Sequence, residues 1–272
     1  MAHPQIAVFA RLAEGNQKPL RKVEGQNTML ARTMHGIAYH RLRDEFFVPQ
    51  PFAQSILAFR GAIAGDEAPA RYIQGSRTLL NNPTRIDVDP IHDEIFIPEG
   101  ERMLVFSATA SGNAAPIRIM KMPPGVRVNA VAVDYVNNIV IAGNESGSPA
   151  ERYPRLLFLD RTASGDVTPL RAVGGPKTMI TAIFSLRAHS EKGLVLLAMQ
   201  TPVESGPRDE VFVGVWSNLH DDGDVPPRWT IGGPYGVLKQ PRGIDLDTRN
   251  KSVIITDKVL NSVLTFYFPE IF

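Results

Sequence analysis

The most informative segment of this sequence reads Gly65-Asp66-Glu67-Ala68-Pro69-Ala70-Arg71-Tyr72-Ile73-Gln74-Gly75-Ser76-Arg77-Thr78-Leu79-Leu80. Its first part, Gly-[Asp/Asn]-x-x-Pro, occurs five times, with spacings of 50, 47, 53 and 58 residues between the glycines Gly15, Gly65, Gly112, Gly165 and Gly223. Arg follows the Pro by two residues in four copies, at Arg21, Arg71, Arg118 and Arg171. Three copies continue as Gly-x-x-Thr, at Gly25, Gly75 and Gly175. Five copies in register indicate a repeat protein with units of about 50 residues.

Short apolar runs around each turn motif predict four strands per repeat, named a, b, c and d here. In one repeat, 86–89 predicts strand a, 94–97 strand b and 104–106 strand c, and strand d is expected after the Gly-[Asp/Asn]-x-x-Pro turn. β-Branched and aromatic residues between Asp, Asn, Gly and Pro turns are typical of strands and hairpins. The chain is therefore expected to be a single domain, 1–272, with repeats near 1–33, 34–83, 84–129, 130–181, 182–242 and 243–272.

A four-stranded sheet of this size does not bury both of its faces alone, whereas sheets stacked around an axis do. The sequence therefore predicts an all-β fold, a β-propeller of four-stranded blades. The strand count allows five or six blades, with the N- and C-terminal strands closing the ring. Six blades are expected if the chain is an N-terminally shortened form of a longer protein. A β-solenoid is the structural alternative, although its repeats are usually shorter.

The composition excludes several classes of protein. Lys+Arg 29 against Asp+Glu 28 gives a formal net charge of +1, so nucleic acid or an anionic membrane would need a local basic patch. The chain has no Cys, which excludes disulfides, thiolate metal sites and Cys nucleophiles. No apolar run reaches the roughly 18 residues of a membrane span, and the N-terminus has no signal-peptide core. The sequence predicts a cytoplasmic protein, or a periplasmic or extracellular one whose leader has been removed.

Three segments carry a resemblance to a known family: Gly36-Ile37-Ala38-Tyr39, Ile86-Asp87-Val88-Asp89-Pro90 and Arg242-Gly243-Ile244-Asp245. They resemble bacterial NHL-like β-propellers. That family belongs to the six-bladed group that includes gluconolactonase-type and streptogramin-lyase-type proteins. The resemblance covers nearly the whole chain and implies the fold, whereas a propeller fold alone does not imply an activity.

Aligned repeats predict a ring of polar side chains around the mouth of the central channel. One column, at the end of strand b, contains Gln50, Glu99, Asn144, Gln200 and Asp257. The start of strand a contributes His35, Arg85, Asn129, Thr181 and Arg242 beside it. Such a ring is suited to a small polar ligand or a hard cation such as Ca²⁺. In the alternative structural interpretation, Arg85 pairs with Glu99 and Arg242 with Asp257 across the a–b hairpins.

Two functions remain open from the sequence. The chain contains no recognisable catalytic motif, which favours a non-catalytic binding or scaffolding module without a cofactor, with another protein or a small ligand as its partner. The resemblance to gluconolactonase-type propellers implies the alternative, a metal-dependent lactonase-like hydrolase or lyase. Its divalent cation would be held by Glu99, Asn144 and Asp257, and His35 is then a candidate acid/base.

The remaining signals concern the connections between strands. The d–a connections carry Arg32, Arg77, Lys177, Lys239 and Arg242, so the channel-mouth face is expected to be locally basic and suited to an anionic ligand or an acidic partner. The long b–c connections 143–153 and 200–209 are expected on the same face. The loops of the channel-mouth face are expected to offer only one aromatic residue, Tyr235. Specific nucleic-acid binding is therefore not predicted. His40, His92 and His189 are expected in solvated a–b turns on the opposite face.

Overall fold

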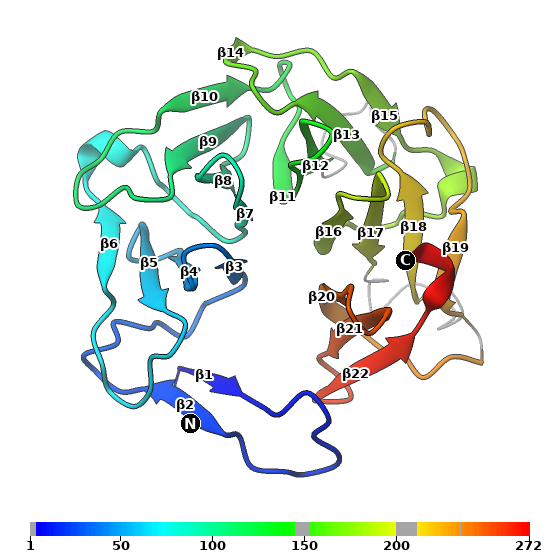
Figure 1. Ribbon diagram of the computed structural model, residues 1–272. Coiled ribbons are helices and arrows are strands. Elements are labelled where there is room, and N and C mark those ends of the chain that lie inside the picture. The colour runs from blue at the N-terminus through cyan, green and yellow to red at the C-terminus, as the bar shows by residue number, and fades with distance from the viewer. Residues whose placement is uncertain (1–3, 145–152, 200–210, 234) are drawn as a thin grey trace. The chain divides into compact units, whose positions relative to one another are not determined.

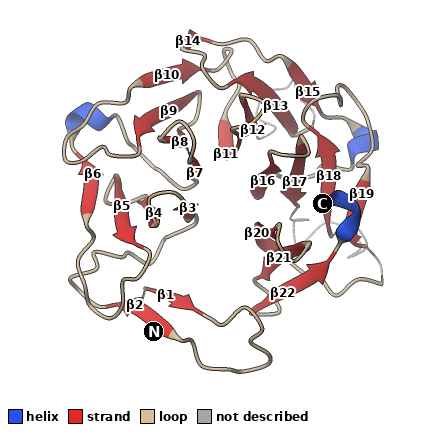
Figure 2. Ribbon diagram, viewed as in Figure 1, coloured by secondary structure: helices blue, strands red, loops and turns tan. Residues whose placement is uncertain are grey.

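The computed structural model describes residues 4–144, 153–199, 211–233 and 235–272. Strands joined by turns make up nearly all of the regular structure, as Figure 2 shows, and short 3₁₀ turns occur at Ser76–Thr78, Pro176–Thr178 and Pro269–Ile271. Within these described ranges, no helix is long and apolar enough to cross a membrane.

Four sheets contain strands in the predicted order a, b, c, d, as their labels in Figure 1 show. The first contains β3 (Ala38–His40), β4 (Glu45–Gln50), β5 (Ser55–Arg60) and β6 (Arg71–Gln74). The second contains β7 (Asp87–Asp89), β8 (Glu94–Pro98), β9 (Arg102–Ser107) and β10 (Arg118–Lys121). The third contains β11 (Val128–Asp134), β12 (Ile139–Asn144), β13 (Arg155–Asp160) and β15 (Arg171–Val173). The fourth contains β16 (Ser185–His189), β17 (Leu194–Ala198), β18 (Phe212–Ser217) and β19 (Trp229–Gly232).

The terminal sheets are smaller. At the C-terminus, β20 (Pro241–Asp247), β21 (Ser252–Asp257) and β22 (Ser262–Tyr267) supply strands a, b and c. At the N-terminus, β1 (Gln5–Val8) and β2 (Arg21–Glu24) pair as strands c and d. Five sheets thus begin with a, b and c, and the predicted fold class, an all-β β-propeller of four-stranded antiparallel blades, is confirmed with five blades. Ring closure by the terminal strands stays a prediction.

Four of the five Gly-[Asp/Asn] turns join the strand d that precedes them by a short parallel bridge. Gly65 bridges Val23, and the Gly65 N–H donates to the Lys22 carbonyl at 2.7 Å. The same bridge forms between Gly112 and Ile73 and between Gly223 and Val173. At Gly165 it lengthens to a two-residue strand, β14 (Gly165–Asp166), which pairs in parallel with β10. The four glycines have φ between 60° and 75°, a conformation that favours glycine, so the repeat encodes the joints between successive sheets.

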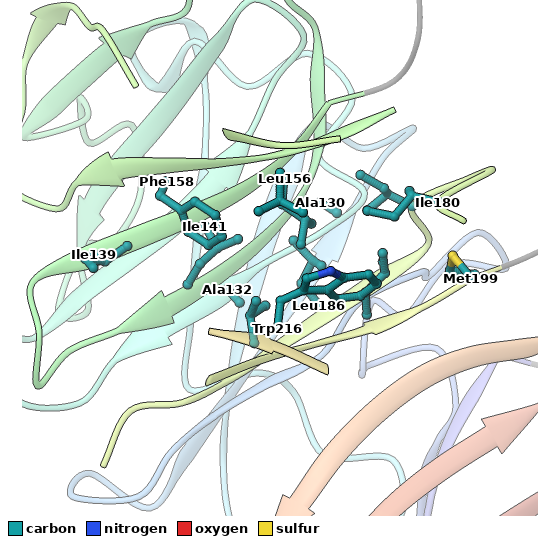
Figure 3. Close-up of a cluster of buried hydrophobic side chains, with 14 of the residues drawn as sticks. Ala130, Ala132, Ile139, Ile141, Leu156, Phe158, Ile180, Leu186, Met199 and Trp216 are labelled. Carbon is teal, nitrogen blue, oxygen red and sulfur yellow. The ribbon is translucent and has the colours of Figure 1, made fainter. Parts of the chain in front are cut away.

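The chain forms two compact units, which are described separately below. Unit 1 comprises Met1–Ile97 and Val105–Ile117, and unit 2 comprises Pro98–Leu104 and Arg118–Phe272. In unit 1 the core gathers around Val48, Leu57 and Phe59, and the rings of Phe46 and Phe59 stack with centroids 5.2 Å apart. In unit 2 the largest cluster lies between the third and fourth sheets and surrounds the fully buried Trp216, as Figure 3 shows.

Burial on both faces explains why strands b and c are apolar nearly throughout. All residues of β12 and β17 are buried, and neither strand alternates with polar positions as a half-exposed strand would. Because burial of apolar surface contributes roughly 25 cal/mol per Å², burial of both faces of β12 and β17 stabilises the third and fourth sheets.

Each sheet has two ends, which are named by the connections that they carry. At the b–c end, strand b ends, strand c begins, and the d–a connection arrives from the preceding sheet. At the a–b end, strand a turns into strand b. The predicted polar column belongs to the b–c end, and His40, His92 and His189 belong to the a–b end.

Candidate functional site

The Gly-x-x-Thr part of the repeat forms a hydrogen-bonded turn in the d–a connection. The Thr78 hydroxyl donates to the Gly75 carbonyl at 2.7 Å and accepts from the Leu80 N–H at 3.3 Å. The Arg77 N–H donates to Asn113 Oδ1 at 2.7 Å, and Asn113 lies in the Gly-Asn turn of the next repeat. In the other two copies, Thr28 and Thr178 donate to the Gly25 and Gly175 carbonyls. The N–H groups of Asn27 and Lys177 donate to Asp66 Oδ1 and Asp224 Oδ1. The Asp and Asn side chains of the repeat thus hold connections in place.

Gly75 is required in this turn for two reasons. Its φ is 133°, and a Cβ added there would lie 2.5 Å from Asn113 Oδ1. The residue after Thr78, Leu79, has a left-handed conformation with φ 61° and an exposed side chain. Met29 and Met179 are exposed in the same conformation in the other two copies, with φ 58° each. The repeat therefore places an apolar side chain in solvent at a strained backbone position.

The repeated Arg has a structural role. Arg71 Nη1 and Nη2 donate to the Glu45 carboxylate at 2.5 and 2.8 Å, and Nη2 also donates to the Ala108 carbonyl. The Arg71 guanidinium lies 5.6 Å from the centroid of the Phe47 ring. The hydrogen bond from Arg71 lowers the pKa of Glu45 below its ordinary value. The other copies also donate to carbonyl oxygens: Arg21 to Gly61, Arg118 to Arg161 and Arg171 to Asn218.

Two members of the predicted polar column hold d–a connections. Gln50 is fully buried, and its Oε1 accepts from the Ala31 N–H at 2.8 Å. Asp257 is 2% exposed; its Oδ2 accepts from the N–H groups of Lys239 and Gln240, both at 2.7 Å. Its Oδ1 accepts from those of Val259 and Leu260, both at 3.0 Å. Both side chains therefore stabilise the backbone at the b–c end.

The pKa of Asp257 reflects these four donors. Burial alone raises the pKa of a carboxyl group, but the four backbone N–H groups more than offset it and bring the Asp257 pKa below its ordinary value. Asp257 is consequently ionised at neutral pH. Because four N–H groups occupy its oxygens, a cation would have to displace some of them.

The arginines at the start of strand a contact a carbonyl oxygen and an aromatic ring, and the predicted pairing of Arg85 with Glu99 stays a prediction. Arg85 Nη1 donates to the His35 carbonyl oxygen at 2.7 Å within unit 1. In unit 2, Asp257 lies opposite Pro241, and a bulge follows at Arg242. The Arg242 guanidinium lies 3.9 Å from the centroid of the Phe184 ring instead of pairing with Asp257. Burial lowers the pKa of Arg242.

The other members of the predicted ring are placed separately. Glu99 lies in the β8–β9 turn, where its N–H donates to the Arg102 carbonyl at 2.8 Å. Asn144 ends β12, is fully buried, and lies opposite Val128. Gln200 and most of the connections 143–153 and 200–209 lie outside the described residues. In the part of the chain that the structure describes, no group of three or more His, Asp and Glu residues could hold a metal ion. Metal binding by Glu99, Asn144 and Asp257 stays a prediction.

The a–b end of unit 1 contains a charge network that the sequence did not reveal. His40 is 1% exposed, and its Nε2 lies 2.9 Å from Asp93 Oδ1. Arg43 Nε donates to Asp93 Oδ1 at 2.6 Å, and its Nη2 donates to Oδ2. The hydrogen bond from Arg43 lowers the pKa of Asp93. The expectation of a solvated turn was wrong for His40, because it occupies the buried position that Asp89 fills in the next repeat.

His189 is also buried, so the same expectation was wrong there. Its ring lies 5.1 Å from that of Phe272, and burial lowers its pKa below the ordinary value. His92 is exposed as predicted, and its Nδ1 lies 2.7 Å from Asp89 Oδ2. The recurrence of His or Asp at one position of the a–b turn, in His40, Asp89, Asp134, His189 and Asp247, was the available signal.

Several apolar side chains are exposed at the b–c end of each unit. In unit 1 they include Met29, Leu79 and Phe52, which is 82% exposed in the b–c turn. Hydrogen bonds tie that turn to both flanking connections: Gln50 accepts from Ala31, and Gln54 Nε2 lies 3.4 Å from Asn81 Oδ1. In unit 2 the exposed apolar side chains of this end include Met179, Tyr235, Val237, Val259 and Leu260. Exposed apolar groups on a rigid scaffold are typical of interaction surfaces.

No known protein family and no curated relative matches the chain by sequence. Among solved structures, the chain is similar to Kuenenia stuttgartiensis hydrazine synthase, with a TM-score of 0.60 and 12% identity. The similarity covers 92% of this chain and 67% of that one. At this identity the comparison supports the propeller fold alone.

Proposed function

We propose that this protein is a non-catalytic binding or scaffolding module that contacts a protein partner through its b–c ends. One observation carries the proposal: the repeat exposes an apolar side chain in a left-handed conformation in three d–a connections, at Met29, Leu79 and Met179. A non-Gly residue in this conformation costs about 1 kcal/mol or more. Three copies of the repeat bear this cost although the side chain is exposed. A contact between these side chains and another molecule explains why the conformation recurs.

The polar residues at the same ends support this proposal. Gln50, Asp66, Asn113, Asp224 and Asp257 all accept hydrogen bonds from backbone N–H groups. Their oxygens stabilise the connections, which become a rigid platform for the apolar side chains. Rigid presentation favours binding, because less conformational entropy is lost when the partner docks.

We give less weight to the metal-dependent hydrolase or lyase of the lactonase or streptogramin-lyase type. Its proposed ligand Asp257 already accepts hydrogen bonds from four N–H groups, some of which a cation would have to displace. The NHL-like assignment that suggested this chemistry likewise remains a proposal, supported by the propeller fold and by the three quoted segments.

The test compares two double variants of the full chain in affinity capture from the source cell extract, quantified by mass spectrometry. Met29→Glu/Leu79→Glu places charge at the b–c end of unit 1, and Leu42→Glu/Ile91→Glu is the matched control at exposed a–b turns of the same unit. We expect the first variant to lose a stoichiometric partner by about tenfold or more, while the control retains it. Equal capture by both variants, or robust turnover of a small substrate without any partner, would overturn the proposal.

A further inference from the structure

Two segments of unit 2 are clamped together by one carboxylate. Asp257 Oδ2 accepts from the Lys239 and Gln240 N–H groups, and its Oδ1 accepts from those of Val259 and Leu260. The Lys258 N–H also donates to the Gln240 carbonyl at 3.0 Å. The d–a connection 235–240 and the b–c turn 258–260 therefore form one surface, named the clamp surface here.

The clamp surface exposes aliphatic side chains. Val237 is 55% and Val259 61% exposed, whereas Leu238 between Val237 and Lys239 is buried in the core. Burial of Leu238 anchors the connection and directs its two neighbours outward. Leu260 and Tyr235 extend the apolar area into solvent. Two aliphatic groups presented by backbone held at four points need little rearrangement to receive apolar side chains.

The same surface carries positive charge. Lys239 and Lys258 are exposed, and Arg242 follows Pro241, the residue opposite Asp257. Among the described residues, none of these three cations forms an ion pair with a carboxylate. Arg242 stacks on Phe184, and its buried Nε makes no hydrogen bond. The Asp257 carboxylate, which holds this backbone, accepts hydrogen bonds from backbone N–H groups.

We propose that the clamp surface binds an acidic protein segment that carries aliphatic side chains. This inference deepens the proposed function and rests on it. Lys239, Lys258 and Arg242 supply the charge complement for Asp and Glu side chains. Val237, Val259 and Leu260 supply the apolar contact. Nucleic acid is disfavoured, because base stacking needs aromatic side chains and the surface offers Tyr235 alone.

Fluorescence anisotropy with the full chain tests this inference. The probe is a fluorescein-labelled twelve-residue peptide in which Leu alternates with Glu. One comparison peptide has Ser in place of Leu, and the other has Lys in place of Glu. A labelled twelve-nucleotide single-stranded DNA tests nucleic acid as the alternative ligand. We expect the Leu/Glu peptide to bind about tenfold more tightly than either comparison peptide and than the DNA.

Charge variants locate the binding surface. Lys239→Glu/Lys258→Glu should raise the Kd for the Leu/Glu peptide about tenfold or more. Lys192→Glu/Lys251→Glu is the matched control, because it makes the same change in net charge at a–b turns of unit 2 and should leave the Kd unchanged. Val259→Ser should weaken the Leu/Glu peptide without changing the weak binding of the Ser/Glu peptide.

Three results would overturn the inference: no binding of the Leu/Glu peptide, equal losses in both charge variants, or tighter binding of the DNA that is sensitive to the Lys239→Glu/Lys258→Glu change. A failure of this inference can be told apart from a failure of the proposed function. If Met29→Glu/Leu79→Glu abolishes partner capture while Lys239→Glu/Lys258→Glu does not, the binding module stands and the clamp-surface inference fails.

Discussion

The a–b end of unit 1 and the b–c end of unit 2 use charged side chains in opposite ways. At the a–b end, His40 and Arg43 both contact Asp93, so charge is paired within the fold. At the b–c end, Asp257 accepts only backbone N–H groups, and Lys239 and Lys258 stay in solvent beside aliphatic side chains. One end thus pairs its charged side chains within the fold, whereas the other leaves the Lys239 and Lys258 side chains exposed.

The largest expected effect comes from removing the charge of Asp257. Asp257→Asn replaces one acceptor oxygen with an NH₂ group that faces two N–H donors, so we expect the free energy of unfolding to fall by about 3 kcal/mol in chemical denaturation. Asp245→Asn is the control, because Asp245 is exposed and pairs with Arg187 at 2.9 Å; it should cost less than about 1 kcal/mol. Equal losses would contradict the role of Asp257 as the clamp.

The difference in unfolding free energy between the wild type and Asp257→Asn should shrink at low pH. The pKa of Asp257 in the fold lies below its ordinary value, so its stabilisation is complete above the ordinary Asp pKa of about 3.9 and is lost as pH falls through the folded pKa. The gap in unfolding free energy between the wild type and Asp257→Asn should therefore be constant from pH 7 to about pH 5 and narrow below about pH 4. A gap that grows on acidification would contradict this account.

A smaller effect is expected at the turns of the b–c end. Gly75→Ala should lower the free energy of unfolding by about 2 kcal/mol, because its Cβ would lie 2.5 Å from Asn113 Oδ1 at φ 133°. Gly112→Ala is the matched control, because the φ of Gly112 is 60° and nothing lies within 4 Å of the added Cβ. Only the left-handed conformation should then lower the free energy of unfolding, by about 1 kcal/mol. Thermal unfolding followed by circular dichroism measures both, and a larger loss for Gly112→Ala would contradict the contact.

The smallest effect is expected at the a–b end. Asp93→Asn removes the partner of Arg43 and His40, but Asp93 is 41% exposed, so we expect a loss of about 1 kcal/mol that shrinks as salt is added. Binding of the Leu/Glu peptide should not change. If Asp93→Asn weakened that peptide as much as Lys239→Glu/Lys258→Glu does, the distinction between the two ends would be lost.

The fold was predictable because the repeat encodes backbone requirements. Gly65 and its equivalents need a positive φ for the parallel bridge, and Gly75 needs space as well. Such requirements show in the sequence as fixed residue types at fixed spacing. The functional site was harder to predict, since residue type does not reveal which way a side chain points. Gln50 and Asp257 were identified as a polar column, yet both turn toward backbone N–H groups.

Long-range partners account for the other differences. Asp93 lies 53 residues beyond His40 in sequence, so no local pattern shows that His40 is buried beside it. The bulge at Arg242 shifts that side chain onto Phe184, and a regular hairpin register would not predict it. The exposed Met29, Leu79 and Met179 did leave a signal, because an apolar residue follows Thr in all three complete copies.

Site-specific photo-crosslinking tests the central claim most directly, namely that the b–c ends meet the partner. Benzoylphenylalanine can replace Phe52 and Tyr235, which are exposed aromatic residues of the b–c ends, and Leu42 and Ile91, which are exposed at the a–b end. With the captured partner, we predict crosslinks from positions 52 and 235 and none from positions 42 and 91. Crosslinks from positions 42 and 91 alone would contradict the account.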